Sequence, residues 1–410
     1  MKIAFIVDSF PSLSETFILN QITGLIDLGH HIEIYSGSRP ADSKFHPEVQ
    51  EYKLLDQTTY YNEIPDVYLQ RLWGAARMLP SCLRTNFLAT VNSLNFVKQR
   101  RDALSMRLIY QIKNFIDKAP FDVIYCHFGP NGIKGTLLKR LGVKGRLITT
   151  FHGYDLSSYL SERKFNIYDD LFKYGDLFLP ISVFWQKKLI TMGCPYDKIK
   201  VHHMGIDMNK FKFIPRKYTH DEPIRLLTVA RLVEKKGISF SISAVANILS
   251  KHKNIEYVIV GDGPLRNELT NQIHQLGATE QVKLMGWQSG DATRSILEKA
   301  HIMILHSIVS KTGDMEGIPV SLMEAMAMGL PVISTWHSGI PELIEDGNSG
   351  FLIKEKDISD LTNKIITMIK NPSIWQDFGA AGRKVVERDF NIKKLNRDFI
   401  NACESILYRQ

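Results

Sequence analysis

Cysteines are scarce in this sequence, and none is placed to hold a metal or to close a short loop. Only 4 occur in 410 residues, there is no CxxC pair, and no clustered histidines accompany them. This scarcity argues against a disulfide framework and against a zinc site, so we expect free, mostly buried thiols and no metal. The four cysteines are Cys82, Cys126, Cys194 and Cys403.

Long apolar runs are missing as well. No run approaches the ~18 residues that a membrane-spanning helix needs, although 44% of the residues are hydrophobic and 23% are charged, as in an ordinary globular protein. The opening stretch MKIAFIVDSF carries an aspartate at position 8 and predicts a buried strand rather than a secretion signal. We therefore expect a cytoplasmic protein.

Acidic residues are outnumbered, which leaves a net charge of +8. Between residues 65 and 118, nine Lys or Arg stand against three acids and are interleaved with apolar residues such as Trp73 and Phe87. One interpretation is a set of helices that cover a core with a solvated basic face. The other is a surface from Leu72 to Arg107 that docks peripherally on anionic lipid. No nucleic-acid-binding motif accompanies the charge, so we expect no nucleic acid partner. The basic residues are Arg71, Arg77, Arg84, Lys98, Arg100, Arg101, Arg107, Lys113 and Lys118.

Short β-branched runs recur along the whole chain, with helical patterns between them. Strands that alternate with helices are typical of parallel sheets in doubly wound α/β domains. The pattern predicts two Rossmann-like domains, residues 1–211 and 223–389, joined by a charged linker with two prolines at 211–225. An amphipathic helix at about 390–410 has no strand partner and is predicted to pack back on the first domain. The predicted strands are KIAFIVD, HIEIYSG, DVIYCHF, RLITTFHG, LFLPIS, KVHHMGI, IRLLTVA, EYVIVG, VKLMGW, IMILHS, PVIST and GFLIK.

The segment EGIPVSLMEAMAMGLPVIST, residues 316–335, carries two glutamates around the start of a predicted helix. Pro319 suits the first helical turn, and Gly329 with Pro331 ends the helix. Glu316 then precedes the helix and Glu324 lies on its second turn. The free N–H groups at the helix start form an anion site, beside which carboxylates fit neutral sugar hydroxyls. The alternative is an ordinary helix with acids near its N-terminus. The anion site would comprise Gly317, Ile318, Pro319, Val320 and Ser321.

A second motif, VARLVEKKG at residues 229–237, follows the first strand of the second domain. Arg231 and Lys236 stand five residues apart in it. Two cations that converge on one diphosphate would stabilise it as a leaving group, Arg in a bidentate manner and Lys as a point charge. Taken alone, the same stretch also fits solvated basic residues of a loop.

Together these motifs resemble family-4 glycosyltransferases of the GT-B fold. Arg231 and Lys236, GDGPLR at 261–266, the two glutamates and GIPELI at 339–344 occur in the order that the family shows. In the first domain, FPSLSETFILNQI at 10–22 is similar to the bacterial exopolysaccharide glycosyltransferases of the colanic-acid type. The resemblance implies a retaining, metal-independent hexosyltransferase that needs no cofactor and uses a nucleotide sugar as its co-substrate.

The resemblance also implies roles for single residues. The second domain would hold a UDP- or GDP-activated hexose and the first an acceptor, which we expect to be a lipid-linked oligosaccharide at the inner face of the membrane. Arg231 and Lys236 would bind the diphosphate. Glu316 would bind the transferred sugar and Glu324 the ribose. The other donor-binding positions are Gly261, Trp287 and Gln288, the last two near the base.

Two histidines of the first domain follow predicted strands. His152, in TTFHGYD, matches a family position that contacts the donor sugar. His127, in CHFGPNG, would line the acceptor side of the cleft. For either histidine alone, a hydrogen-bonded structural role is the alternative.

The loop after the first strand lacks glycine, although many members of the family carry glycines there. It offers Ser14, Glu15 and Thr16 instead. Ser14 or Thr16 could cap the following helix and present a hydroxyl to a phosphate. Glu15 would turn toward acceptor hydroxyls, because a phosphate would repel it. A plain Ser/Thr cap without a ligand is the alternative.

Two other functions compete with a transferase. GDGPLR could belong to a dinucleotide-binding loop, but Arg266 stands where the third glycine would be and no acid ends the next strand. That departure disfavours an NAD-dependent oxidoreductase. A catalytically silent sugar-nucleotide-binding module would keep the cleft and lose the catalytic cations, yet Arg231 and Lys236 are both present.

Overall fold

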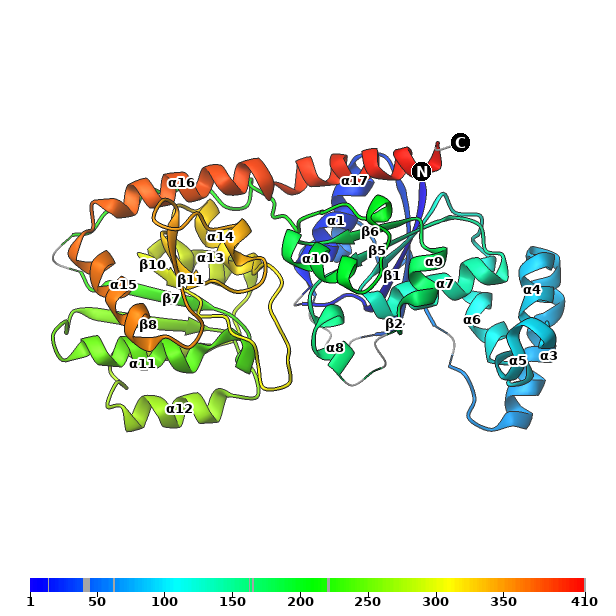
Figure 1. Cartoon of the computed structure of the whole chain (residues 1–410), viewed down its shortest axis with the longest axis horizontal. Helices are drawn as coiled ribbons and strands as arrows, with labels where there is room; N and C mark the ends of the chain where they lie inside the picture. Colours follow the sequence, from blue (N-terminus) through cyan, green and yellow to red (C-terminus); the bar gives the residue numbers. More distant parts are fainter. Residues whose placement is uncertain are drawn as a thin grey trace.

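The structure is a computed structural model that describes residues 1–13, 15–39, 45–61, 63–161, 163, 166–219 and 222–408, without the side chains of residues 96, 98 and 100. Two six-stranded sheets lie side by side, one in each half of the molecule (Figure 1). All the strand pairs within them are parallel. The predicted class, α/β with two doubly wound Rossmann-like domains, is confirmed.

The first domain has the strand order β3-β2-β1-β4-β5-β6. Its elements are β1 (Lys2–Ser9), α1 (Thr16–Asp27), β2 (His31–Ser38), α2 (Pro47–Glu51), β3 (Thr58–Tyr60), α3 (Tyr68–Thr85), α4 (Phe87–Ser93), α5 (Phe96–Leu104), α6 (Arg107–Ile116), β4 (Val123–His127), α7 (Gly129–Leu141), β5 (Arg146–Phe151), α8 (Ser158–Ser161), α9 (Asp169–Tyr174), β6 (Leu177–Pro180) and α10 (Val183–Thr191), with 3₁₀ turns at Tyr154–Leu156 and Tyr196–Lys198.

The second domain has the order β12-β11-β10-β7-β8-β9. Its elements are β7 (Ile224–Val229), α11 (Ile238–Leu249), β8 (Ile255–Val260), α12 (Arg266–Gln275), β9 (Val282–Gly286), α13 (Gly290–Lys299), β10 (Ile302–Ile304), α14 (Val320–Ala327), β11 (Val332–Thr335), β12 (Gly350–Ile353), α15 (Ile358–Lys370) and α16 (Ile374–Asp389), with 3₁₀ turns at Glu234–Lys236 and Ile340–Glu342; α17 (Ile392–Leu407) follows.

One predicted strand is wrong. The run KVHHMGI, residues 200–206, extends along β6 through only two backbone hydrogen bonds, from Lys200 to Phe178 and from His202 to Pro180, and forms no regular strand. The sixth strand of the first sheet is instead β3, three half-buried residues that pair with β2. An alternating apolar pattern cannot tell an irregular edge segment from a strand, and a three-residue strand carries almost no pattern.

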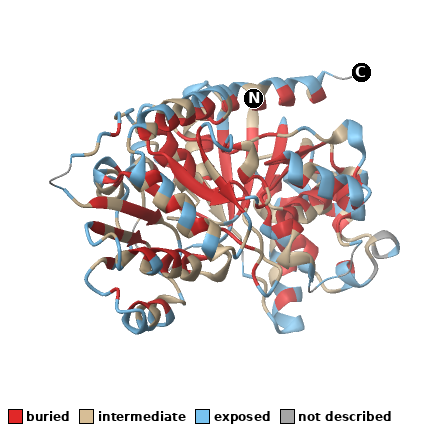
Figure 2. Cartoon of the chain, turned by 60° about the vertical axis from the view of Figure 1, so that its left-hand side comes forward, coloured by how far each residue is buried: buried red, intermediate tan, exposed pale blue. Residues whose placement is uncertain are grey.

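Both sheets are buried between helical layers, as Figure 2 shows by the red strands at the centre of each domain. Each sheet has one apolar cluster on each face. Helix α16 packs on the second domain, and α17 continues from it along the top of the first (Figure 1). Phe399 and Cys403 of α17 lie in one cluster with Ile18 and Ile22 of α1. All four cysteines are buried.

The strand order of each sheet reverses once, between β1 and β4 in the first domain and between β7 and β10 in the second. In open α/β sheets, ligands bind at such reversals, outside the carboxyl ends of the strands. The loops that follow β1, β4, β7 and β10 are therefore the places where a binding site is expected.

Candidate active site

A cleft of about 1070 Å³ lies between the two domains, at the carboxyl ends of both sheets. It brings together most of the residues that the sequence motifs single out, from loops far apart in the chain. Ser14 lies outside the described residues, and neither His127 nor Glu324 is among the residues that line the cleft. The predicted residues that do line it are Glu15, Thr16, His152, Arg231, Lys236, Gly261, Trp287, Gln288, Glu316, Gly317, Ile318, Pro319, Val320 and Ser321.

Glu316 and Lys236, 80 positions apart, form an ion pair inside the cleft. Only 13% of either side chain is exposed, so the pair is largely shielded from water. Burial alone would raise the pKa of Glu316, but Lys236 and then Lys235 lower it to about 2. The sequence interpretation expected neutral sugar hydroxyls, and no cation, beside the carboxylate of Glu316. In the structure Lys236 neutralises the charge of Glu316, so Glu316 stays ionised and can accept hydrogen bonds in the cleft.

Two hydrogen-bonded side chains, His337 and Glu355, hold the loop that carries Glu316. The backbone N–H of Glu316 donates to Nε2 of His337 at 2.9 Å, so the other ring nitrogen, Nδ1, carries the proton. That nitrogen donates to Oε1 of Glu355 at 2.6 Å. The sequence interpretation missed both residues. His337 lies two positions after the end of β11, so its place near a strand's carboxyl end was the signal available.

Arg231 leaves β7 into the cleft and is exposed. It forms no ion pair within the described residues, in contrast to its neighbour Lys235, which binds Asp314 at 3.0 Å. Across the cleft it faces Glu15 of the first domain. Burial and then the charge of Asp8 raise the pKa of Glu15 to about 7, while Arg231 opposes this.

The loop after β1 does not cap helix α1 in the predicted way. The residue at the N-cap is Glu15, its side chain makes no capping hydrogen bond, and Thr16 is already the first helical residue. The cap interpretation for Thr16 is therefore wrong. Both residues line the cleft instead.

Helix α14 points its N-terminus at the cleft. Pro319 is at its N-cap without a side-chain cap, and the residues from Gly317 to Ser321 line the cleft. The predicted helix start at the cleft is thus observed, but the helix begins one residue after Pro319, and the N–H of Gly317 donates to Oε1 of Glu316 at 3.3 Å. Glu324 lies on the second turn, where burial raises its pKa to about 7 and Arg294 partly offsets the effect.

The raised pKa of Glu324 predicts a cost in stability. An acid with a folded-state pKa near 7 and an unfolded-state pKa near 4.5 destabilises the fold progressively as pH rises between these values, and fully above pH 7. Glu324→Gln removes the charge, so it should stabilise the protein at pH 8 by up to about 2–3 kcal/mol and have no effect at pH 4.5. Urea denaturation of both proteins at the two pH values tests this; an equal difference at both would refute it.

Two glycines allow the backbone to approach closely at the cleft. Gly261 has φ +134°, and a Cβ there would lie 1.9 Å from the carbonyl oxygen of Ala230. A Cβ on Gly317 would lie 2.7 Å from the carbonyl oxygen of His152, which belongs to the other domain. Only glycine fits either position, and the second lets the two walls of the cleft touch.

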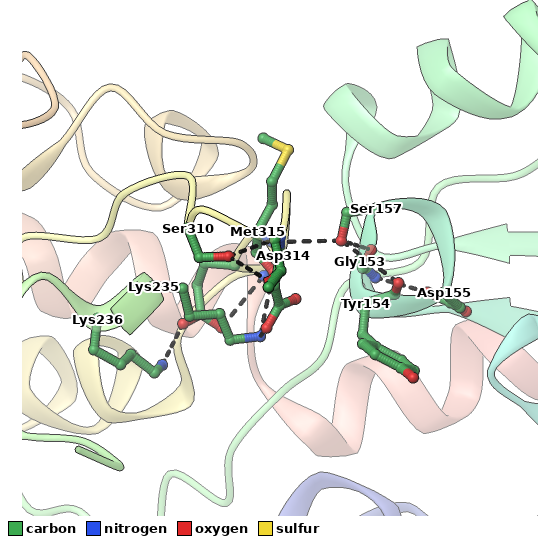
Figure 3. Close-up of polar contacts among 12 residues, drawn as sticks. Gly153, Tyr154, Asp155, Ser157, Lys235, Lys236, Ser310, Asp314 and Met315 are labelled. Carbon is green, nitrogen blue, oxygen red and sulfur yellow. Dashed lines mark hydrogen bonds and ion pairs between the residues drawn. The ribbon is translucent and has the colours of Figure 1, made fainter. Parts of the chain in front are cut away.

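Polar contacts also cross between the domains. The backbone N–H of Met315 donates to Oγ of Ser157 at 3.4 Å (Figure 3). Glu342, in the GIPELI motif, accepts hydrogen bonds from the backbone N–H groups of Val183 and Phe184 at the start of α10, at 3.0 and 3.2 Å. The GIPELI motif thus joins the second domain to the first through Glu342.

Two doubly wound domains that face each other across a cleft, with cations and a helix N-terminus on one wall, are the arrangement of GT-B glycosyltransferases. Residues 14–210 match the family described as Glycosyltransferase Family 4, and residues 210–385 match the one described as Glycosyl transferases group 1. A putative colanic acid biosynthesis glycosyltransferase, WcaL of Salmonella typhimurium, is 36% identical over 99% of this chain and 100% of its own length. The amylovoran biosynthesis glycosyltransferase AmsK of Erwinia amylovora is 38% identical over 95% of this chain and 96% of its own.

The chain belongs to the family-4 glycosyltransferases, in the group that contains these two relatives. This membership rules out the NAD-dependent oxidoreductase. Among solved structures, Anabaena Alr3699/HepE in complex with UDP-glucose matches with a TM-score of 0.72 at 18% identity, over 99% of this chain and 100% of that one. Sucrose-phosphate synthase from Thermosynechococcus elongatus also reaches 0.72, at 16% identity over 99% of both chains. These likenesses confirm the GT-B fold.

Proposed function

We propose that the chain transfers a hexose (galactose, glucose or mannose) from a UDP- or GDP-sugar to a sugar hydroxyl of a lipid-linked oligosaccharide, with retention of configuration. The relatives named for colanic acid and amylovoran biosynthesis support a role in exopolysaccharide, capsule or lipopolysaccharide synthesis. The complexes of HepE with UDP and with UDP-glucose favour a UDP-sugar. The observation that carries the proposal is the convergence of Arg231, Lys236 and the α14 N-terminus on one wall of the cleft.

The same wall supports a mechanism without a bound cofactor. The two cations and the helix start would neutralise the departing diphosphate. Glu316 is a poor general base because its pKa is about 2, so it would accept hydrogen bonds from the transferred sugar. As the bond from the anomeric carbon to the diphosphate breaks, the acceptor oxygen bonds to that carbon on the same face. The departing phosphate oxygen takes the acceptor's proton.

Donor choice and activity can be tested together. UDP-galactose, UDP-glucose and GDP-mannose are titrated into the protein, and donor hydrolysis is followed with and without a lipid-linked acceptor. One donor should bind and turn over, and NMR of the product should show the donor's anomeric configuration. Binding of a donor without any turnover would indicate a silent binding module and refute the proposed activity.

The acceptor's lipid would require the first domain to lie near a membrane. Among the described residues, no helix is long and apolar enough to cross one. Helices α3–α5 project from the end of the first domain that is remote from the second (Figure 1). Within the described part of the chain, one face of α3 is apolar and exposed, with Trp73 69% and Leu69 66% exposed. Leu72 and Leu83 extend this stripe at helical spacing.

The basic excess is smaller at the surface than the sequence indicates. Arg71 is buried and donates to the carbonyl oxygens of Ser105 and Pro65, while Lys113 and Lys118 form ion pairs. The cations that remain exposed within the described side chains are Arg77, Arg84, Arg101 and Arg107.

We therefore propose docking of the α3 stripe on anionic lipid, with the stripe bordered by Arg77 and Arg84, which lie four and eleven positions after Trp73. Each cation near an anionic surface contributes roughly 1 kcal/mol, so binding should be reversible and salt-sensitive. In co-sedimentation, Arg77→Glu/Arg84→Glu and Trp73→Ser should each abolish binding to phosphatidylglycerol vesicles. The charge-matched control Lys251→Glu/Lys253→Glu, on the second domain, should retain it. Equal binding to neutral vesicles, or none by the unaltered protein, would contradict docking.

A further inference from the structure

His127 and His152 form a hydrogen-bonded pair at the carboxyl ends of neighbouring strands. His127 is the last residue of β4, and His152 follows β5. Nδ1 of His127 lies 3.0 Å from Nε2 of His152, and the two ring planes, inclined by 23°, lie edge to edge with their centroids 5.2 Å apart. His152 lines the cleft, whereas His127 is fully buried behind it. The nitrogen of His152 that remains for a ligand is therefore Nδ1.

Both rings are neutral at physiological pH. Burial lowers the pKa of His152 to about 3, and burial, together with His152 and His202, lowers the pKa of His127 well below its ordinary value. A neutral imidazole has one N–H donor and one acceptor nitrogen. Only two arrangements of the pair are then possible, because either His127 or His152 supplies the proton between them.

The surroundings of His127 distinguish these arrangements. Its second nitrogen, Nε2, is buried and has no hydrogen-bond partner within the described part of the chain. The rings of Phe5 and Tyr125 pack against the imidazole, with centroids 5.7 and 4.7 Å away. If His152 supplied the proton, His127 would carry a buried N–H without an acceptor, and buried side-chain polar groups without a partner are rare in native structures. The proton between the rings is therefore placed on Nδ1 of His127.

We propose that His127 is a positioning residue that fixes the tautomer of His152, so that Nδ1 of His152 is an N–H donor aimed into the cleft. The consequence of this tautomer rests on the proposed function: the N–H of His152 would donate a hydrogen bond to an oxygen of the nucleotide sugar, either a sugar hydroxyl or a phosphate oxygen. A neutral ring with a fixed proton orients the ligand without exchanging protons with it. His127 thus acts through His152. The sequence interpretation placed it on the acceptor side of the cleft, but it is not among the residues that line the cleft.

The tautomer can be observed directly, without any assay of activity. In protein labelled with ¹⁵N-histidine, the nitrogen chemical shifts distinguish protonated from unprotonated ring nitrogens, and His152→Gln assigns the signals. We expect a protonated Nδ1 and an unprotonated Nε2 for His152, unchanged between pH 6 and 8. A protonated Nε2 would overturn the proposal, whatever the enzyme's substrate proves to be.

Two substitutions of similar size separate positioning from packing. His127→Asn keeps an amide N–H near the site of Nδ1, whereas His127→Leu removes any donor. For transfer from the accepted donor sugar, we expect the Leu variant to lose about tenfold or more in kcat and the Asn variant to stay within about threefold of the unaltered protein. Free UDP or GDP should bind both alike. Equal losses in the two variants, or none in the Leu variant, would refute positioning; if the Leu variant does not fold, the nitrogen shifts decide.

Discussion

Arg231→Ala should lower kcat about 10²-fold or more, since one preorganised group that stabilises developing charge typically contributes that much. The side chain is exposed in the cleft and makes no ion pair within the described residues, so its loss should leave the unfolding transition unchanged. Lys236→Ala should lower kcat by a similar factor for the same electrostatic reason. Steady-state turnover of the accepted donor sugar and urea denaturation measure both quantities.

Lys236→Ala should differ from Arg231→Ala in stability. The sequence predicts a loop cation with little effect on folding, but the structure pairs Lys236 with the largely buried carboxylate of Glu316. Removal of one partner of such a pair typically costs about 3 kcal/mol or more. The double variant Lys236→Ala/Glu316→Gln should recover most of that stability without recovering activity.

Arg388→Ala is the control for both cation variants. Arg388 is exposed on α16 and is not among the residues that line the cleft, so neither turnover nor stability should change by much. Near-normal turnover in both Arg231→Ala and Lys236→Ala would remove the basis for a diphosphate site on this wall.

Much of the fold could be predicted because hydrophobic pattern and strand spacing are local. All six strands of the second domain appear where apolar runs alternate with helical patterns. The errors are at the edge of the first sheet, where β3 is only three residues long and residues 200–206 follow β6 without becoming a strand. Edge segments bury little, so their side chains leave little pattern.

The candidate site could be predicted in its membership but not in its contacts. Parallel strands end at a common edge, so residues that follow strands, such as Arg231 and His152, are brought to one cleft. Which partner each side chain meets depends on packing between distant segments. The pairing of Lys236 with Glu316 and the contact of His127 with His152 leave no trace in local sequence.

The exposed charge of the surface could not be predicted from the sequence either. A count of Lys and Arg treats every cation as solvated, whereas Lys118 pairs with Glu33, 85 positions away in the chain. Arg71 is buried, and its guanidinium donates hydrogen bonds to carbonyl oxygens near the start of α3 and the end of α5. Only the folded chain shows that Arg77 and Arg84 remain beside an unpartnered apolar stripe.

Glu316→Gln and Glu324→Gln should affect different steps if the two glutamates bind different parts of the donor. Glu316→Gln should depress kcat by about 10²-fold, because the amide loses the charge that strengthens hydrogen bonds from the transferred sugar. It should not weaken the binding of free UDP or GDP, because Lys236 is then released from its ion pair and can contact the diphosphate.

Glu324→Gln should instead weaken binding of the nucleotide itself. Hydrogen bonds to a charged group contribute about 1.5–3 kcal/mol, so the dissociation constant for free nucleotide should rise roughly tenfold to a hundredfold. Because the pKa of Glu324 is raised to about 7, affinity in the unaltered protein should also increase from pH 6 to pH 8 as the carboxyl ionises. The Gln variant should lose this pH dependence.

Calorimetric titration with UDP and GDP at both pH values, together with turnover, separates these roles. Glu268→Gln, on the first turn of α12 and exposed, replaces a carboxylate of the same domain that is not among the residues lining the cleft, so it should change neither quantity. Equal losses of nucleotide affinity in Glu316→Gln and Glu324→Gln would contradict the division of roles. Such a result would mean that Glu316 and Glu324 hold the start of α14 together as one structural unit, with the ribose bound elsewhere on the wall.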